Sequence, residues 1–110
     1  MEFLTELKRT HRNGELRAAN VGDEVVLMGW VNTRRDHGGC IFIDLRDREG
    51  ITQIRFDSTV DADLYELGGQ LRNEYVLAIS GVVESRGENS NPRMKTGEIE
   101  VLAKRAEIMN

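Results

Sequence analysis

The chain has 110 residues, with 15 basic and 19 acidic side chains and a formal net charge of −4 at pH 7. This length predicts a single domain, and the negative charge excludes a protein that binds nucleic acid mainly through bulk positive charge. One cysteine and two histidines are too few for an internal disulfide or a zinc site. The polar N-terminal segment and the lack of a long apolar run exclude a secretory signal and a membrane span. We therefore expect a cytoplasmic protein without membrane contact.

The first third of the chain predicts a lead, a strand and a loop. Residues 1–13 form a short polar lead, so that the folded domain spans residues 14–110. The apolar segment Val25–Val31, with Gly29 near its centre, predicts a long bent strand that is buried on both faces. Residues 33–39 then predict a loop, which contains two consecutive glycines.

Two alternating segments, residues 40–47 and 51–57, predict a hairpin closed by a two-residue loop at Arg48 and Glu49. In that register one face pairs apolar residues, Ile41 with Phe56 and Ile43 with Ile54. The other face carries Phe42 opposite Arg55 and Asp44 opposite Gln53. An aromatic ring beside hydrogen-bonding groups is typical of a surface on which nucleic-acid bases stack. The alternative is that Phe42 packs beneath a loop or a chain terminus.

The second half of the chain completes an all-β pattern. Residues 61–71 predict a short helix, with leucines at helical spacing and acidic residues at its N-terminal end. Residues 75–83 and 98–109 predict two strands, separated by a long, polar, mobile loop at 84–97. This is the order of an oligonucleotide-binding (OB) fold, a five-stranded Greek-key barrel with one short helix between strands 3 and 4. The competing architecture is a one-sided antiparallel sheet covered by the helix.

Three sequence blocks carry a resemblance to a known family: GWVNTRRDHGGCIFIDLRDREGITQ, then LRNEY, then TGEIEVLA. In this order and spacing they resemble the N-terminal anticodon-binding domain of bacterial-type aspartyl-tRNA synthetases. These enzymes belong to the class II subgroup that also holds the asparaginyl and lysyl enzymes, which typically lack the RDREG turn. The chain departs from the family at Thr33, where a third consecutive basic residue is usual, and at Ser58-Thr59, where Asp-Pro is common.

The resemblance implies that the domain recognises a tRNA anticodon. Phe42 would stack on an anticodon base, and the Gln53 amide would recognise the central uridine. Glu100 would accept hydrogen bonds from the first anticodon base. Further contacts with bases or phosphates are implied for Arg35, Arg55, Arg86 and Asn89. From the residues alone, a solvated surface position is the favoured interpretation of Glu100 and Arg35, and the resemblance reverses that preference.

Two further positions bear on which tRNA is bound. His37 and Gly87 resemble the residues found in bacterial enzymes that charge both aspartate and asparagine tRNAs. The resemblance places them beside the third anticodon base, which differs between the two tRNAs. A tRNA-dependent amidotransferase would then convert the mischarged product. The alternative is that His37 is an ordinary loop residue and Gly87 a turn residue.

The sequence contains no set of residues typical of catalysis or of phosphate or metal binding. The acidic residues Asp44, Asp47 and Glu49 border a turn and are interpreted as solvated charges or cross-strand pairs. The resemblance implies that the catalytic domain lies beyond Asn110, in a homodimeric aspartate–tRNA ligase that uses ATP and magnesium. The alternatives are a stand-alone OB-fold protein that binds single-stranded RNA or DNA, and a barrel that binds only other proteins.

Overall fold

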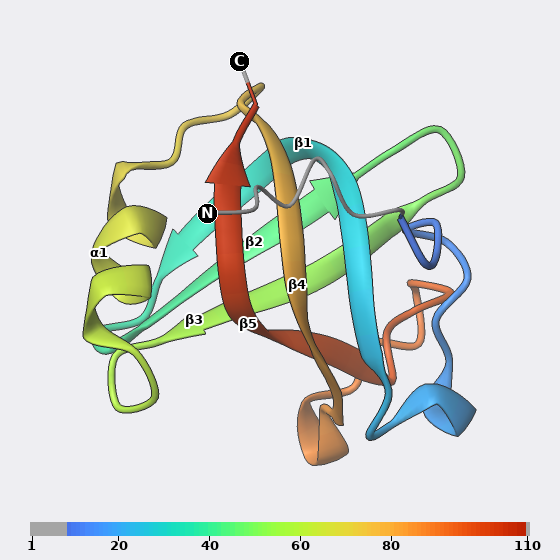
Figure 1. The fold of residues 1–110 in the computed structure, drawn as a ribbon. Helices are drawn as coiled ribbons and strands as arrows, with labels where there is room; N and C mark the ends of the chain where they lie inside the picture. Colours follow the sequence, from blue (N-terminus) through green and yellow to red (C-terminus); the bar gives the residue numbers. More distant parts are fainter. Residues whose placement is uncertain (1–8, 110) are drawn as a thin grey trace.

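The computed structural model describes residues 9–109, and within them five strands close into a barrel (Figure 1). Neighbouring strands around the barrel follow the order β1-β2-β3-β5-β4, and only β3 and β5 run parallel. The predicted OB-fold is therefore confirmed, and the one-sided sheet is wrong because β4 pairs with β1 and closes the ring. The elements are β1 (Glu24–Asp36), β2 (Cys40–Arg46), β3 (Ile51–Asp57), α1 (Ala62–Gln70), β4 (Val76–Ser85) and β5 (Ile99–Ile108), with short 3-10 helices η2 (Ala18–Asn20) and η3 (Gly87–Asn89).

The β2–β3 hairpin has the predicted register, with Phe42 opposite Arg55 and apolar residues opposite each other on the inner face. The Asp47 side chain stabilises the turn, because it accepts hydrogen bonds from the N–H groups of Glu49 at 2.8 Å and Gly50 at 3.1 Å. This carboxylate therefore has a structural role. The two-residue loop fixes which side chains of β2 and β3 face outward together.

Strand β1 is longer than the sequence predicted, and the following loop is shorter. After a bulge at residues 31–33, the strand continues to Asp36 by pairing with β2, which leaves only residues 37–39 as the loop. Only one face of the first half is fully buried, so the expected burial on both faces is wrong. Gly29 is required by a close approach, since a Cβ there would lie 2.3 Å from the Arg46 carbonyl oxygen.

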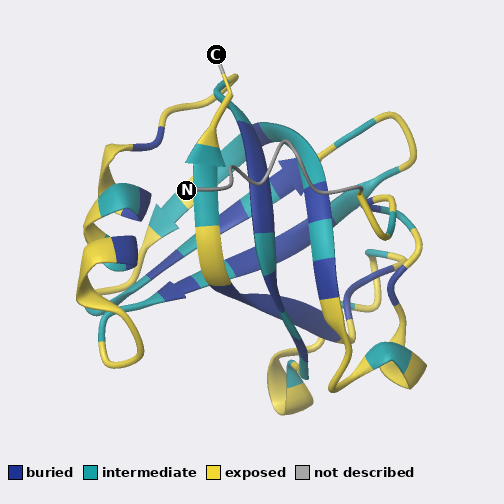
Figure 2. Cartoon of the chain, viewed as in Figure 1, coloured by how far each residue is buried: buried dark blue, intermediate teal, exposed yellow. Residues whose placement is uncertain are grey.

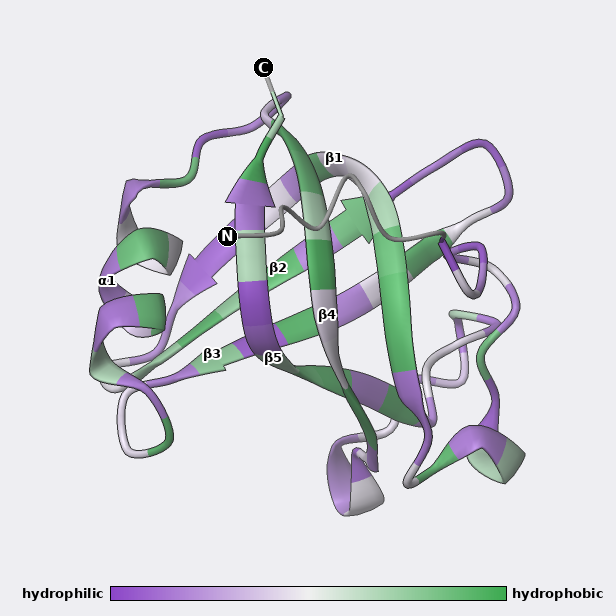
Figure 3. Ribbon diagram, in the orientation of Figure 1, coloured by the Kyte–Doolittle hydropathy of each residue, from purple (hydrophilic) through white to green (hydrophobic). Residues whose placement is uncertain are grey.

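Aliphatic side chains from all five strands fill the barrel interior, together with Leu16 and the ring of Phe56. Figures 2 and 3 show that the strands carry most of the buried and hydrophobic positions of the chain. The predicted helix is present as α1 and covers one end of the barrel (Figure 1). It begins after Asp61, whose carboxylate accepts a hydrogen bond from the Leu64 N–H at 3.0 Å. Gly68 lets the helix lie against the core, because a Cβ there would be 3.0 Å from the Phe56 ring.

Residues 9–13 of the expected lead lie against the barrel. The Thr10 N–H donates to a β1 carbonyl at 3.0 Å. Asn13 is fully buried, and its side chain donates to the Met28 carbonyl at 3.0 Å. Residues 1–8 lie outside the described part of the chain, and the boundary at residue 14 stays a prediction.

Candidate nucleic-acid interface

A groove of about 810 Å³ runs over the outer face of β2 and β3, beside the β4–β5 loop. We call it the main groove. Eight of the nine predicted site residues line it, whereas Gly87 does not: Arg35, His37, Phe42, Gln53, Arg55, Arg86, Asn89 and Glu100. Residues from four strands and two loops thus meet in one place.

A chain of hydrogen bonds crosses the floor of the main groove. Arg35 Nη2 donates to Gln53 Oε1 at 2.8 Å, and Gln53 Nε2 donates to Glu100 Oε1 at 2.8 Å. The other Glu100 oxygen accepts a hydrogen bond from Arg55 Nη1. These contacts join β1, β3 and β5, and they fix the orientation of the Gln53 amide, with its oxygen toward Arg35 and its nitrogen toward Glu100.

Gln53 and Glu100 are more buried than the strand alternation predicted. They lie on the outer side of the sheet, yet only 6% and 7% of their surfaces are exposed. The reason is that side chains of neighbouring strands pack over them, and the β4–β5 loop borders the same groove. Strand alternation alone, which would leave outward-facing side chains exposed to solvent, therefore gives the wrong exposure at these two positions.

Asp44 forms a cross-strand pair, as one of the interpretations of the sequence held. Its carboxylate lies 3.3 Å from Arg35 Nη1 and accepts a hydrogen bond from the Thr33 hydroxyl at 2.8 Å. Thr33 is the position where the resembled family usually has a basic residue. Here its hydroxyl helps to hold the Asp44 carboxylate beside Arg35.

Arg55 lies among three carboxylates, those of Glu100, Glu84 at 2.8 Å and Asp57 at 3.6 Å. Burial alone would lower the pKa of Arg55, but the Glu100 and Glu84 carboxylates outweigh it and raise that pKa above its usual value. Sequence reasoning missed Asp57 and Glu84 as site residues. Strand alternation could have predicted Asp57, because it lies two residues after Arg55 on β3 and therefore on the same face.

The charges on this floor favour contact with bases over contact with phosphates. Three cations, Arg35, Arg55 and Arg86, face four carboxylates, those of Asp44, Asp57, Glu84 and Glu100. A phosphate would meet no excess of positive charge here, because Asp44, Asp57 and Glu100 balance the three cations of the lining and Glu84 pairs with Arg55. The edge of a base carries no net charge and can exchange hydrogen bonds with amide, guanidinium and carboxylate groups.

Phe42 is half-buried and is flanked by Arg35 on β1 and Arg55 on β3. Its ring meets the exposed His37 edge to face, with ring centroids 5.3 Å apart and planes at 81°. The predicted aromatic surface is thus present in the groove, with a second ring beside it.

The β4–β5 loop also lines the main groove, through residues that include Arg86 and Asn89. Nε and Nη1 of Arg86 are buried, and neither has a hydrogen-bond partner within residues 9–109. Buried donors without partners are unfavourable, so a ligand that accepts hydrogen bonds from them would be stabilised. Gly87 has a φ of 55°, where other residues are strained, which gives it a turn role. The mobility expected of this loop stays a prediction.

Cys40 also lines the main groove. Burial, assisted by the Asp57 carboxylate, raises the pKa of its thiol, which is therefore protonated at neutral pH. Among residues 9–109, no three histidine, cysteine or acidic side chains are grouped so as to hold a metal ion. The same part of the chain has no helix with the length and apolarity needed to span a membrane.

The chain is similar to curated proteins over nearly its whole length. The family model described as the OB-fold nucleic acid binding domain, of the tRNA anticodon type, matches residues 25–109. The aspartate–tRNA(Asp/Asn) ligase of Anaeromyxobacter sp. strain K is 61% identical over 108 residues, which cover 98% of this chain and 18% of that protein. The ligase of the same name from Caldanaerobacter subterraneus subsp. tengcongensis is 54% identical over 110 residues, or 99% and 19%. The chain thus spans about a fifth of the length of these relatives.

Solved structures share the fold. The asparaginyl-tRNA synthetase from Pyrococcus horikoshii has a TM-score of 0.79 and 26% identity over 94% of this chain and 23% of its own. An OBody bound to hen egg-white lysozyme has a TM-score of 0.82 and 28% identity, with 94% and 96% covered. The barrel topology and the family match over most of the chain agree. The chain belongs to the tRNA anticodon-binding family of OB-fold nucleic acid binding domains.

Proposed function

We propose that this domain recognises the anticodon of aspartate tRNA as part of a longer aspartate–tRNA ligase. The observation that carries the proposal is the fixed Gln53 amide on the floor of a groove that Phe42 lines. The names of relatives that are 61% and 54% identical over nearly the whole chain support the same function.

The fixed amide of Gln53 suits uracil better than cytosine. Its carbonyl oxygen and its NH₂ group each have one bonding position left after the contacts with Arg35 and Glu100. Uracil presents an N–H donor at N3 and a carbonyl acceptor at C4, whereas cytosine presents an acceptor and a donor in the opposite order. An amide that cannot turn over therefore pairs with only one of the two edges.

The anticodon bases on either side would use the other walls of the groove. A base stacked on Phe42 gains about 1 to 3 kcal/mol. Glu100 uses one lone pair on each oxygen for Gln53 and Arg55, which leaves acceptor capacity for the N–H groups of a purine edge. The unpartnered N–H groups of Arg86 are available to base or phosphate oxygens.

The proposal extends to both tRNAs that the relatives' names include, those for aspartate and asparagine. His37 is exposed and contacts the Phe42 ring, so it can lie beside a base that stacks there. Comparable binding of the two anticodons supports this extension. A preference for the aspartate anticodon beyond about 100-fold, or ~2.7 kcal/mol, refutes it. Gly87 lies outside the groove lining, so its part in discrimination stays a prediction.

The whole protein would supply the chemistry. This chain corresponds to 18% of the first relative, so the proposed catalytic domain, with its ATP and magnesium, would lie outside it. A homodimeric assembly and a cytoplasmic location belong to the same proposal.

Titration of the domain with anticodon stem–loops tests the function. An anticodon-recognising domain loses affinity when only the anticodon is changed, and Phe42→Ala weakens cognate binding by about 5- to 150-fold, the equivalent of one stacked base. The matched control is Phe42→Tyr, which keeps an aromatic face. Equal affinity for unrelated RNA loops indicates a general single-strand binder, and no RNA binding indicates a protein-interaction barrel; either outcome refutes the proposal.

A further inference from the structure

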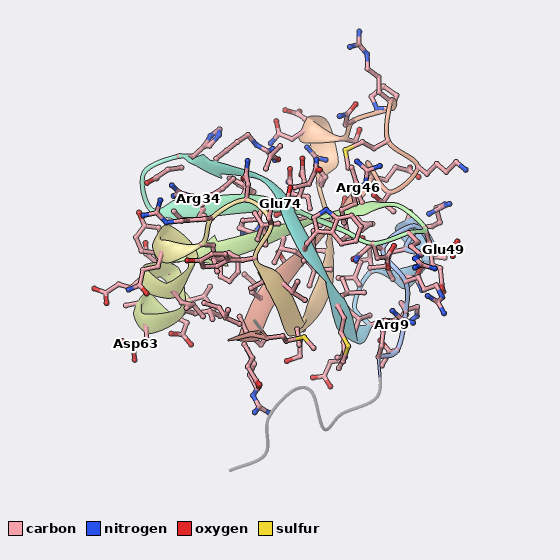
Figure 4. The ribbon with its side chains drawn as sticks, turned by 90° about the horizontal axis from the view of Figure 1, so that it is seen from above. Arg9, Arg34, Arg46, Glu49, Asp63 and Glu74 are labelled. Carbon is pink, nitrogen blue, oxygen red and sulfur yellow. The ribbon has the colours of Figure 1, made fainter. Side chains whose placement is uncertain are left out.

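A second groove, of about 400 Å³, lies where the β2–β3 turn meets the β4–β5 loop. Figure 4 labels Arg46 and Glu49 at this end of the molecule. We call it the basic groove, because four exposed cationic side chains line it: Arg46, Arg48, Arg93 and Lys95. Within residues 9–109, none of the four forms an ion pair. Their charges are therefore available to a ligand.

Hydrogen bonds of the β4–β5 loop hold the segment that bears Arg93 and Lys95 beside the β2–β3 turn, which bears Arg48. The Thr96 hydroxyl donates to the Ile51 carbonyl at 2.5 Å, which ties the loop to the start of β3. The Asn91 N–H donates to the Gly97 carbonyl at 2.8 Å. A Cβ at Gly97 would lie 1.8 Å from the Asn91 oxygen, so only glycine permits this closure. The segment that bears Arg93 and Lys95 is thus positioned by the fold.

The two grooves differ in charge, because cations and carboxylates balance in the main groove and cations exceed carboxylates in the basic groove. Two acidic residues line the basic groove, and one of them, Asp47, accepts hydrogen bonds from three backbone N–H groups. Four cations therefore face Glu49 and a carboxylate already engaged by the turn. In a chain with a net charge of −4, this groove concentrates positive charge, whereas the floor of the main groove does not. The basic groove therefore attracts the polyanionic backbone of a nucleic acid, whereas the main groove is suited to the uncharged edge of a base.

The two grooves are neighbours. Met94 lines both of them. Phe42 of the main groove and Arg46 of the basic groove are four residues apart on β2, so their Cα atoms are separated by about 13 Å at 3.3 Å per residue. A single RNA strand can therefore occupy both grooves at once.

We propose that the basic groove binds the phosphodiester backbone of the RNA strand whose bases enter the main groove. The inference rests on the proposed function, because it assigns the strand that continues from that groove. Phosphate contacts position a nucleic acid without recognising its sequence. The basic groove therefore adds the same affinity for every anticodon, and the main groove alone discriminates between anticodons.

The test compares two double variants of the 110-residue chain. Arg93→Gln/Lys95→Gln removes two cations from the basic groove. Arg72→Gln/Lys104→Gln removes two exposed cations that line neither groove, so both variants change the net charge equally. Affinities for anticodon stem–loops with cognate and altered anticodons are measured over a range of salt concentrations. Thermal unfolding checks that both variants keep the fold.

We expect the basic-groove variant to bind every stem–loop more weakly by one common factor. The slope of log affinity against log salt should shrink by about 0.7 for each single-strand phosphate that is no longer neutralised, or about 1.4 for two. Arg46→Gln/Arg48→Gln, on the other side of the groove, should give the same result. A slope and affinity equal to those of the control variant overturn the inference. A wild type that ignores the anticodon refutes the proposed function instead, and a reduced slope would still support the basic groove.

Discussion

The orientation of the Gln53 amide makes a sharp prediction about the central anticodon base. Arg35 holds its oxygen and Glu100 holds its nitrogen, each at 2.8 Å. Turning the amide over would place N–H groups against a guanidinium and an oxygen against a carboxylate. Either anchor alone therefore keeps the orientation, and only the removal of both releases it.

The expected magnitude follows from two hydrogen bonds to one base edge. A bidentate contact of this kind discriminates between bases by about 1 to 3 kcal/mol, so wild-type protein should prefer uridine over cytidine at the centre by about 5- to 150-fold. Arg35→Met and Glu100→Gln should each keep most of that ratio, although overall affinity falls. The double variant should bring the ratio close to one, because its amide can face either way.

The assay is fluorescence titration of stem–loops that differ only at the central base, performed on wild type, both single variants and the double variant. Thermal unfolding shows that each variant is folded at the assay temperature. A double variant that keeps the wild-type ratio refutes the reasoning, and so does a single variant that loses the ratio completely. Both results would mean that the two anchors do not set the amide orientation.

Two further predictions concern the loop and the thiol. Gly97→Ala should lower stability and RNA affinity together, since its Cβ would lie 1.8 Å from the backbone oxygen of Asn91. The control is Gly69→Ala in α1, whose Cβ meets nothing within 4 Å and which should stabilise the fold by about 0.5 to 1 kcal/mol. Equal thermal unfolding midpoints for the two variants would contradict this prediction. Cys40, the only cysteine, should react with iodoacetamide at pH 8.5 more slowly in the folded protein than in urea, because burial and the Asp57 carboxylate raise the pKa of its thiol. Bound RNA should slow the reaction further, because Cys40 lines the main groove. Equal rates in folded and unfolded protein would contradict this prediction.

Local pattern was sufficient for the hairpin and the helix. The alternation of residues 40–57 specified the register, because one face had to be apolar. The acidic cap and the spaced leucines located α1 within one residue at each end. From these elements the barrel order and the position of the main groove followed.

Features that depend on partners distant in sequence were missed. The polar second half of β1 has no alternation, and it is a strand because β2 supplies its hydrogen bonds. The burial of Gln53 and Glu100 arises from side chains of other strands, which parity cannot show. Glu84 was assigned to a loop, although β4 continues past it and places its carboxylate on Arg55.

The hydrogen-bond chain from Arg35 through Gln53 and Glu100 to Arg55 crosses the junction of the barrel that has the fewest paired backbone positions. The parallel junction between β3 and β5 has only two paired positions, Ile54 with Val101 and Arg55 with Leu102. Side chains on the floor of the main groove therefore link β3 and β5 where the backbone supplies little pairing. A substitution of Gln53 or Glu100 that changes base preference would also remove side-chain hydrogen bonds between β3 and β5. Evolution of a new specificity would therefore require compensating contacts between these strands.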